Sequence, residues 1–216
     1  MSIQLKGRNI VLAGAFNTPS FDKYFFIKNN IIRESDLTPN SFRTDLNISQ
    51  IVAKSFNILI TPPQIVINLI NETDAGKLED IASKIIEAGD IIQLNAIGFN
   101  FNWNFVDSVK NVTELSKEYF YNDKIQTLNS YFNKPDSKYG FYASTNFENA
   151  RLKLDVKPTS NTRISSTGVE KSETIQFLFN FHFDMPKESK AIEAINYIKE
   201  YGKYKNHSSE IMDKYK

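Results

Sequence analysis

The stretch Gly98-Phe99-Asn100-Phe101-Asn102-Trp103-Asn104-Phe105 decides the fold class, because aromatic and asparagine side chains alternate along it. Successive side chains of a β-strand point to opposite faces of a sheet, so this alternation predicts a strand with one aromatic and one polar face. A second segment repeats the pattern, with Ile175, Phe177, Phe179, Phe181 and Phe183 separated by Gln176, Leu178, Asn180 and His182. Two such strands predict a sheet whose aromatic face is buried.

The rest of the chain predicts further strands and helices around these two. We expect strands at residues 9–16, 56–61, 64–70, 91–105, 139–145 and 150–156, and helices at 75–88, 112–120 and 209–215. Another helix opens near Pro186 and Glu188 and ends at Gly202, and Thr73 with Asp74 caps the helix at 75–88. Residues 31–49 predict an irregular segment, and residues 158–173 predict a mobile hairpin tip.

Apolar residues of two predicted helices identify the other half of the core. Ile81 and Ile85 recur at helical spacing in one helix, as do Ile192, Ile195 and Ile198 in the other. We therefore expect an α+β fold, a largely antiparallel sheet flanked by helices, in one compact unit of residues 1–216. The likeness of the two aromatic strands suggests a degenerate internal duplication, with pseudo-repeat halves 1–110 and 111–216.

Composition excludes several classes of site and partner. The formal net charge is +1, from 26 basic and 25 acidic residues, so no long-range field favours nucleic acid or an anionic membrane. Absence of cysteine excludes disulfides, thiolate zinc sites and cysteine nucleophiles. The two histidines, His182 and His207, lie on different predicted elements, so we expect no metal centre, and no motif indicates a cofactor.

The N-terminal residues combine two cations with a short apolar run. Lys6 and Arg8 precede residues 10–16, which resembles the order of a signal peptide. The run is short and meets polar Asn17 without a convincing cleavage site, so we interpret it as the first strand. No stretch approaches the roughly 20 apolar residues of a membrane helix. We expect a cytoplasmic protein.

Three short strings resemble landmarks of a bacterial family of hypothetical proteins. They are Gly14-Ala15-Phe16-Asn17-Thr18-Pro19, Ala96-Ile97-Gly98-Phe99-Asn100 and Phe179-Asn180-Phe181-His182-Phe183. The similarity consists of these strings and the order of the predicted elements over most of the chain. It implies a bacterial source and a cytoplasmic location, and it carries no reaction or catalytic residue.

The polar face of the predicted sheet holds the candidate site residues. Asn180, His182 and Asp184 lie on one face of one strand, although residues two apart stand roughly 7 Å from one another, too far for a routine hydrogen bond. His182 can exchange a proton near neutral pH, with Asp184 or Asp155 to orient it. A polar ladder of Asn100, Asn102 and Asn104 can bind amide or hydroxyl groups of a ligand. An ordinary solvated strand face accounts for the same residues.

Two functional hypotheses remain open from the sequence. The first is a non-enzymatic bacterial binding or assembly protein, homo-oligomeric or bound to another protein, because no catalytic constellation is visible and antiparallel sheet edges invite pairing. The second is an enzyme or small-ligand binder that uses the polar face around His182, with Asn180 and Asn102 as hydrogen-bond donors to the substrate.

Overall fold

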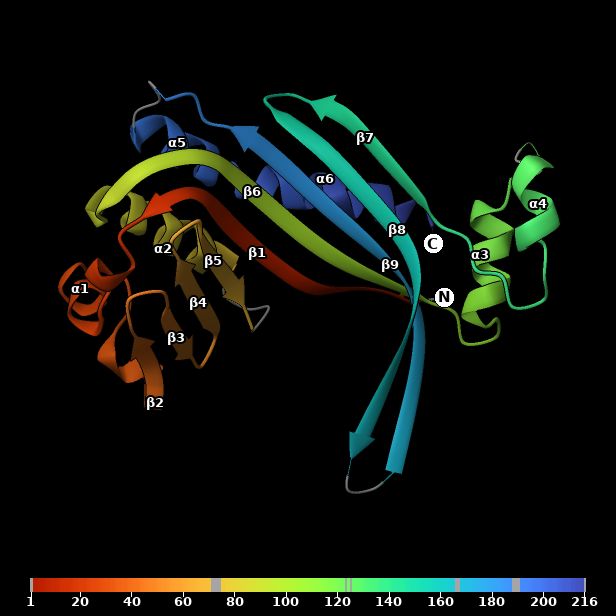
Figure 1. Ribbon diagram of the computed structural model, residues 1–216, viewed down its shortest axis with the longest axis horizontal. Helices are drawn as coiled ribbons and strands as arrows, with labels where there is room; N and C mark the ends of the chain where they lie inside the picture. The colour runs from red at the N-terminus through yellow and green to blue at the C-terminus, as the bar shows by residue number, and fades with distance from the viewer. Residues whose placement is uncertain are drawn as a thin grey trace.

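The computed structural model describes residues 2–70, 75–122, 124, 126–165, 168–187 and 191–215 (Figure 1). Nine strands form one sheet in the order β2-β3-β4-β5-β1-β6-β9-β8-β7, and every pairing between neighbours is antiparallel. A large antiparallel sheet with flanking helices confirms the predicted fold class at this level.

The strands are β1 (Ser2–Phe16), β2 (Leu37–Thr44), β3 (Ser49–Ala53), β4 (Phe56–Thr61), β5 (Gln64–Leu69), β6 (Ile91–Val106), β7 (Phe141–Phe147), β8 (Ala150–Ser165) and β9 (Gly168–Asp184). The α-helices are α1 (Lys23–Lys28), α2 (Ala75–Ala88), α3 (Val112–Phe120), α4 (Gln126–Phe132), α5 (Ala191–Lys199) and α6 (Tyr201–Asp213). Two 3-10 helices, η1 (Thr18–Ser20) and η2 (Glu34–Asp36), lie before β2.

Two long strands, β1 and β6, pair with each other in the middle of the sheet. On the β1 side, β2 to β5 form a meander that ends beside β1, and α2 follows. On the β6 side, β7 to β9 form a meander that ends beside β6, and α5 follows. The order of elements after β1 therefore parallels the order after β6.

One face of the sheet is the core, as the alternation predicts. All the phenylalanines of the two aromatic stripes are buried there, in contact with side chains of α3, α5 and α6, and α2 packs beside them on β5 and β1 (Figure 1). Rings of α6 contact the stripes directly, with Tyr201 5.2 Å from Phe99 and Tyr204 5.1 Å from Phe181 between centroids. Burial of apolar surface stabilises a fold by about 25 cal/mol per Å², so this face carries much of the folding energy.

The helical isoleucines occupy the predicted core positions with one exception. Ile81, Ile85, Ile195 and Ile198 are buried against the sheet. Ile192 is 58% exposed, because it lies in the first turn of α5, ahead of the buried stripe that begins at Ala194.

Two segments that the sequence predicts as irregular contain regular strands. Residues 31–49 include β2, which Pro39 and Asn40 obscure; Asn40 has a φ of 61°, and the pairing with β3 shifts register between Leu37 and Phe42. An edge strand tolerates such residues because its outer side has no partner. Residues 158–173 are not a loop either, since β8 and β9 stay paired from Pro158 opposite Ile175 to Ser165 opposite Gly168, and they project as a ribbon (Figure 1).

The C-terminal helices divide differently from the prediction. Helix α5 ends at Lys199, and Gly202 lies in the first turn of α6 instead of ending the preceding helix. The predicted helix 209–215 is thus the second half of α6. The predicted cap at Thr73 and Asp74, and Glu188, lie outside the described residues. No described helix combines the length and the apolar character needed to cross a membrane.

Strand β1 begins seven residues before the predicted start, because a bulge hides its alternation. Leu5 lies opposite Trp103 and Gly7 opposite Asn102, which leaves Lys6 as an extra residue. Leu5 therefore faces the helices before the bulge, whereas Arg8 faces them after it. The bulge brings Arg8 to the covered side of the sheet, near Tyr201 of α6.

Candidate functional site

An asparagine row crosses the face of the sheet that no helix covers. It consists of Asn57, Asn68, Asn9, Asn100 and Asn180, which lie directly opposite one another on β4, β5, β1, β6 and β9. The Nδ2 of Asn180 donates to Oδ1 of Asn100 at 2.7 Å, and Asn100 donates to Asn9 at 2.7 Å. Asn68 donates to Asn57 at 2.8 Å. The row runs perpendicular to the strands.

Gly98 provides the space beside this row. A Cβ at Gly98 would lie 3.4 Å from Nδ2 of Asn180 and 3.9 Å from Nδ2 of Asn100. Both amides therefore lean over the bare backbone of Gly98, which is itself buried.

The predicted ladder of Asn100, Asn102 and Asn104 along β6 divides into separate parts. Asn100 belongs to the row, whereas the Oδ1 atoms of Asn102 and Asn104 are buried without a hydrogen-bond partner in the described part of the chain. Neighbouring strands are about 4.8 Å apart, while alternate residues of one strand are about 6.6 Å apart, so amides bond across strands more readily than along one.

His182 and Asp184 contact each other on the same open face. His182 Nε2 lies 3.2 Å from Asp184 Oδ1, so the expectation that this spacing is too long for a hydrogen bond is wrong. Side chains lean along the strand, which shortens the gap between them. The Asp184 side chain is 92% exposed and that of His182 is 33% exposed, so water reaches both partners.

Asp155 does not join this pair. It lies opposite Leu178, four residues along β9 from His182, or about 13 Å at 3.3 Å per residue. Its carboxylate pairs with Lys157 at 3.1 Å. The residue opposite His182 is Arg151, whose guanidinium donates to Ser144 at 2.7 Å and to Asn146 at 3.0 Å. The structure therefore brings Asp184 to His182 and leaves Asp155 and Asn102 apart from it.

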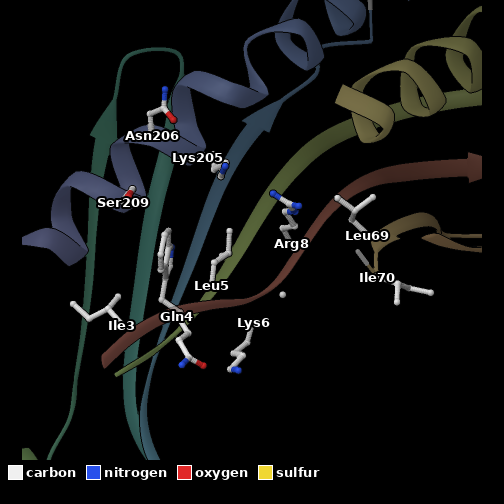
Figure 2. A pocket seen from close by; sticks show the side chains of 12 residues that line it. Ile3, Gln4, Leu5, Lys6, Arg8, Leu69, Ile70, Lys205, Asn206 and Ser209 are labelled. Atoms are coloured by element: carbon white, nitrogen blue, oxygen red, sulfur yellow. The ribbon is translucent and has the colours of Figure 1, made fainter. Parts of the chain in front are cut away.

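A basic pocket of about 650 Å³ lies along β1, between the end of β5 and α6 (Figure 2). Arg8 and Lys205 lie on the α6 side of β1, whereas Lys6 points to the other side. Lys6 and Arg8 of β1 and Lys205 of α6 line it, beside Trp103 of β6 and Ser209 of α6. This pocket was not predicted from the sequence, because its residues come from elements far apart in the chain. The bulge at Lys6 was the one local signal, and it is not visible as a motif.

The wall of the basic pocket is held by hydrogen bonds to α6. Trp103 Nε1 donates to Oγ of Ser208 at 3.1 Å, and this hydroxyl donates to the Lys205 carbonyl at 2.7 Å. Arg8 is 6% exposed and lies close enough to Tyr201 for its charge to act there. Burial raises the pKa of the Tyr201 hydroxyl, and the positive charge of Arg8 opposes that rise.

The two edges of the sheet differ in their protection. Strand β2 carries Pro39, Arg43 and a break in register, features that obstruct pairing with another chain. Strand β7 has the sequence FYASTNF, without charge or proline, and it keeps regular register with β8 over its full length. Tyr142 of β7 is 64% exposed. The β7 edge is therefore the unprotected one.

No family model matches the chain, and no curated protein is similar to it.

Proposed function

We propose that this chain is a non-enzymatic binding protein that assembles with a second copy of itself through the edge strand β7. The observation that carries the proposal is the regular, uncharged edge of β7, residues Phe141–Phe147. Unpaired backbone donors and acceptors of an edge strand are a template for another strand. A second β7 in antiparallel orientation extends the sheet continuously through two copies.

The sequence of β7 suits pairing with itself. Ser144 is the middle residue of the strand, so a two-fold axis there places Phe141 opposite Phe147 of the second copy. Like charges directly opposite one another destabilise a strand pair, and β7 has none. Because the β2 edge is protected, the assembly closes as a dimer and does not grow into a fibre.

A bacterial origin and a cytoplasmic location belong to the same proposal and rest on the resemblance described above. An internal duplication also belongs to it. The parallel order of β1, meander and α2, and of β6, meander and α5, supports a repeat. That order divides the chain before β6, at residue 90, instead of at residue 110.

Charge substitution at the centre of β7 tests the assembly. We expect light scattering to give twice the chain mass for the native protein, and the single-chain mass for Ser144→Lys and Ser144→Glu separately, since each places like charges across the two-fold axis. Mixing these two variants should restore the dimer. The matched control is Thr38→Lys, because Thr38 is exposed and lies on β2, the edge strand at which pairing is obstructed. This variant should remain a dimer.

A native protein that is monomeric at every concentration overturns the proposal. A dimer that survives both Ser144 substitutions places the interface elsewhere and also overturns it.

A further inference from the structure

We propose that helix α4 of each copy packs against the turn between β7 and β8 of the other copy in the β7 dimer. The inference rests on the assembly proposed above and adds a second, helical contact to it. Three side chains of α4 make this contact, and we call them the α4 patch: Leu128, Tyr131 and Phe132.

The α4 patch is apolar and exposed. Its residues are spaced three and four apart, so they lie on one face of the helix. Tyr131 is 70% exposed and Phe132 is 57% exposed. Adjoining exposed apolar side chains mark a surface that another molecule covers, and aromatic residues are enriched in protein interfaces. A helix of seven residues is also too short to be stable through its own hydrogen bonds, so packing on this face stabilises it.

Helix α4 is attached beside the first residue of β7. The Tyr139 hydroxyl donates to the Phe132 carbonyl at 2.8 Å, and Tyr139 comes two residues before Phe141, where β7 begins. The N–H of Tyr139 donates to Ser116 of α3 at 3.1 Å, which fixes this segment on α3. Figure 1 shows α3 and α4 outside the sheet, at the end where β7 begins. The α4 patch therefore lies at one end of the unprotected edge.

The register of the proposed dimer brings the α4 patch to the turn of the second copy. With the two-fold axis at Ser144, Asn149 of the second copy comes opposite Tyr139, the residue that is bonded to Phe132. Glu148 and Asn149 form the turn between β7 and β8. The same contact occurs at the other end of the paired strands, because the axis exchanges the two copies.

The turn between β7 and β8 offers a fixed surface with apolar parts. Phe147, the last residue of β7, stacks on His207 of α6 with the ring centroids 3.9 Å apart. Lys203 of α6 forms an ion pair with Glu148 of the turn. Helix α6 thus holds the turn in place. The two rings and the aliphatic stem of Lys203 supply surface against which tyrosine and phenylalanine can pack.

The size of the strand edge gives an independent reason for a second contact. Seven residues at about 3.4 Å each make β7 roughly 24 Å long. A stable interface buries about 800 Å² on each partner, which is more than the edge of one short strand provides. Two α4 contacts, one at each end of the paired strands, enlarge the interface.

Substitution of Tyr131 tests the contribution of the α4 patch. Tyr131→Ala should raise the dissociation constant of the dimer at least about tenfold in sedimentation equilibrium, because an aromatic anchor is lost at both ends. Circular dichroism checks that the variant keeps the fold. The matched control is Tyr24→Ala, a similarly exposed tyrosine of α1 on the β2 side of the sheet, which should leave the dissociation constant unchanged.

Cross-linking locates the contact directly, because the native chain has no cysteine. A short bis-maleimide should join Phe132→Cys to Asn149→Cys when the two variants are mixed. Each variant by itself should give no covalent dimer, because the two-fold axis places the two copies of one position at opposite ends of the paired strands. Phe132→Cys mixed with Tyr24→Cys is the control and should also remain unlinked.

The outcomes separate the α4 contact from the assembly itself. If the native protein is a dimer that Ser144→Lys dissociates, either an unchanged dissociation constant for Tyr131→Ala or the absence of the cross-link between positions 132 and 149 overturns the α4 contact alone. A native protein that is monomeric at every concentration overturns both proposals.

Discussion

Phe99 and Asn100 are neighbours in the chain, but they belong to opposite faces of the sheet with different physical tasks. The Phe99 face is closed by α2, α3, α5 and α6, and its aromatic rings touch from strand to helix. The Asn100 face is open, and its side chains bond to one another across strands. The covered face therefore supplies most of the folding energy, while the open face holds neighbouring strands in register.

The largest expected effect is on the covered face. Phe181→Ala should lower the free energy of unfolding by about 3–5 kcal/mol, because it empties a fully buried position between Phe101, Phe147 and Tyr204. Urea denaturation measures the change. A loss below about 1 kcal/mol would mean that the aromatic face is loosely packed, and the contrast between the faces would fail.

The open face should respond less strongly. Asn100→Ala should cost about 1–2 kcal/mol, because Asn180 loses its acceptor and Asn9 loses its donor while both are half-buried. Exposed Asn95→Ala is the matched control and should change stability by less than about 0.5 kcal/mol.

A double-mutant cycle sharpens this measurement. Asn100→Ala should couple with Asn9→Ala, to which it is bonded, and should not couple with Asn57→Ala, three strands away in the row. Equal coupling to both positions would contradict the pairwise bonding of the row.

Gly98 offers a smaller and more specific test of the row. Gly98→Ala should cost less than about 0.5 kcal/mol, because its methyl group would lie 3.4 Å from the Asn180 amide nitrogen, which is an ordinary van der Waals contact. In the Asn180→Ala background the same change should be neutral or stabilising, as measured by thermal unfolding. A cost that persists there would show that the backbone, and not the amide, needs the glycine.

The smallest effect concerns a carboxylate on the helical side of the sheet. Burial raises the pKa of Glu79, and the N–H of Gly202, which bonds to it, opposes this rise. A raised folded-state pKa means that Glu79 favours the folded state when protonated and that this contribution is lost as the pH rises. Glu79→Gln should therefore stabilise the protein slightly at pH 7, by about 0.5 kcal/mol or less.

The pH series supplies the control for that variant. The difference between Glu79→Gln and the native protein should disappear near pH 3, where both side chains are neutral. A difference that stays constant with pH would assign the effect to packing and not to charge.

A strand or helix could be predicted from the sequence where its pattern of apolar residues repeats without interruption. Alternation in residues 99–105 and 175–183 and helical spacing around Ile81 and Ile195 identified both sides of the core, because each pattern repeats within one element. The bulge at Lys6 and the break at Asn40 interrupt the period, so the start of β1 and all of β2 were missed.

The candidate sites were less predictable, because they depend on pairing between distant strands. Asn100 and Asn180 could be identified from the sequence as polar residues of the sheet. Their hydrogen-bonded row with Asn9 could be predicted only with the register of β1, β6 and β9. Prediction of the basic pocket also requires the position of α6 over the sheet, and no short-range sequence pattern specifies that position.

The ribbon of β8 and β9 has a consequence for how the protein opens. Strand pairing with β7 reaches Val156 and strand pairing with β6 reaches Ile175, so beyond these residues β8 and β9 pair only with each other among the described strands. Where the ribbon leaves the sheet, Lys138 donates to Ser160 and to Glu173, and Ser160 donates to Glu173. We therefore expect the ribbon to open from its far end and this opening to stop at the three hydrogen-bonded residues, before it reaches the sheet.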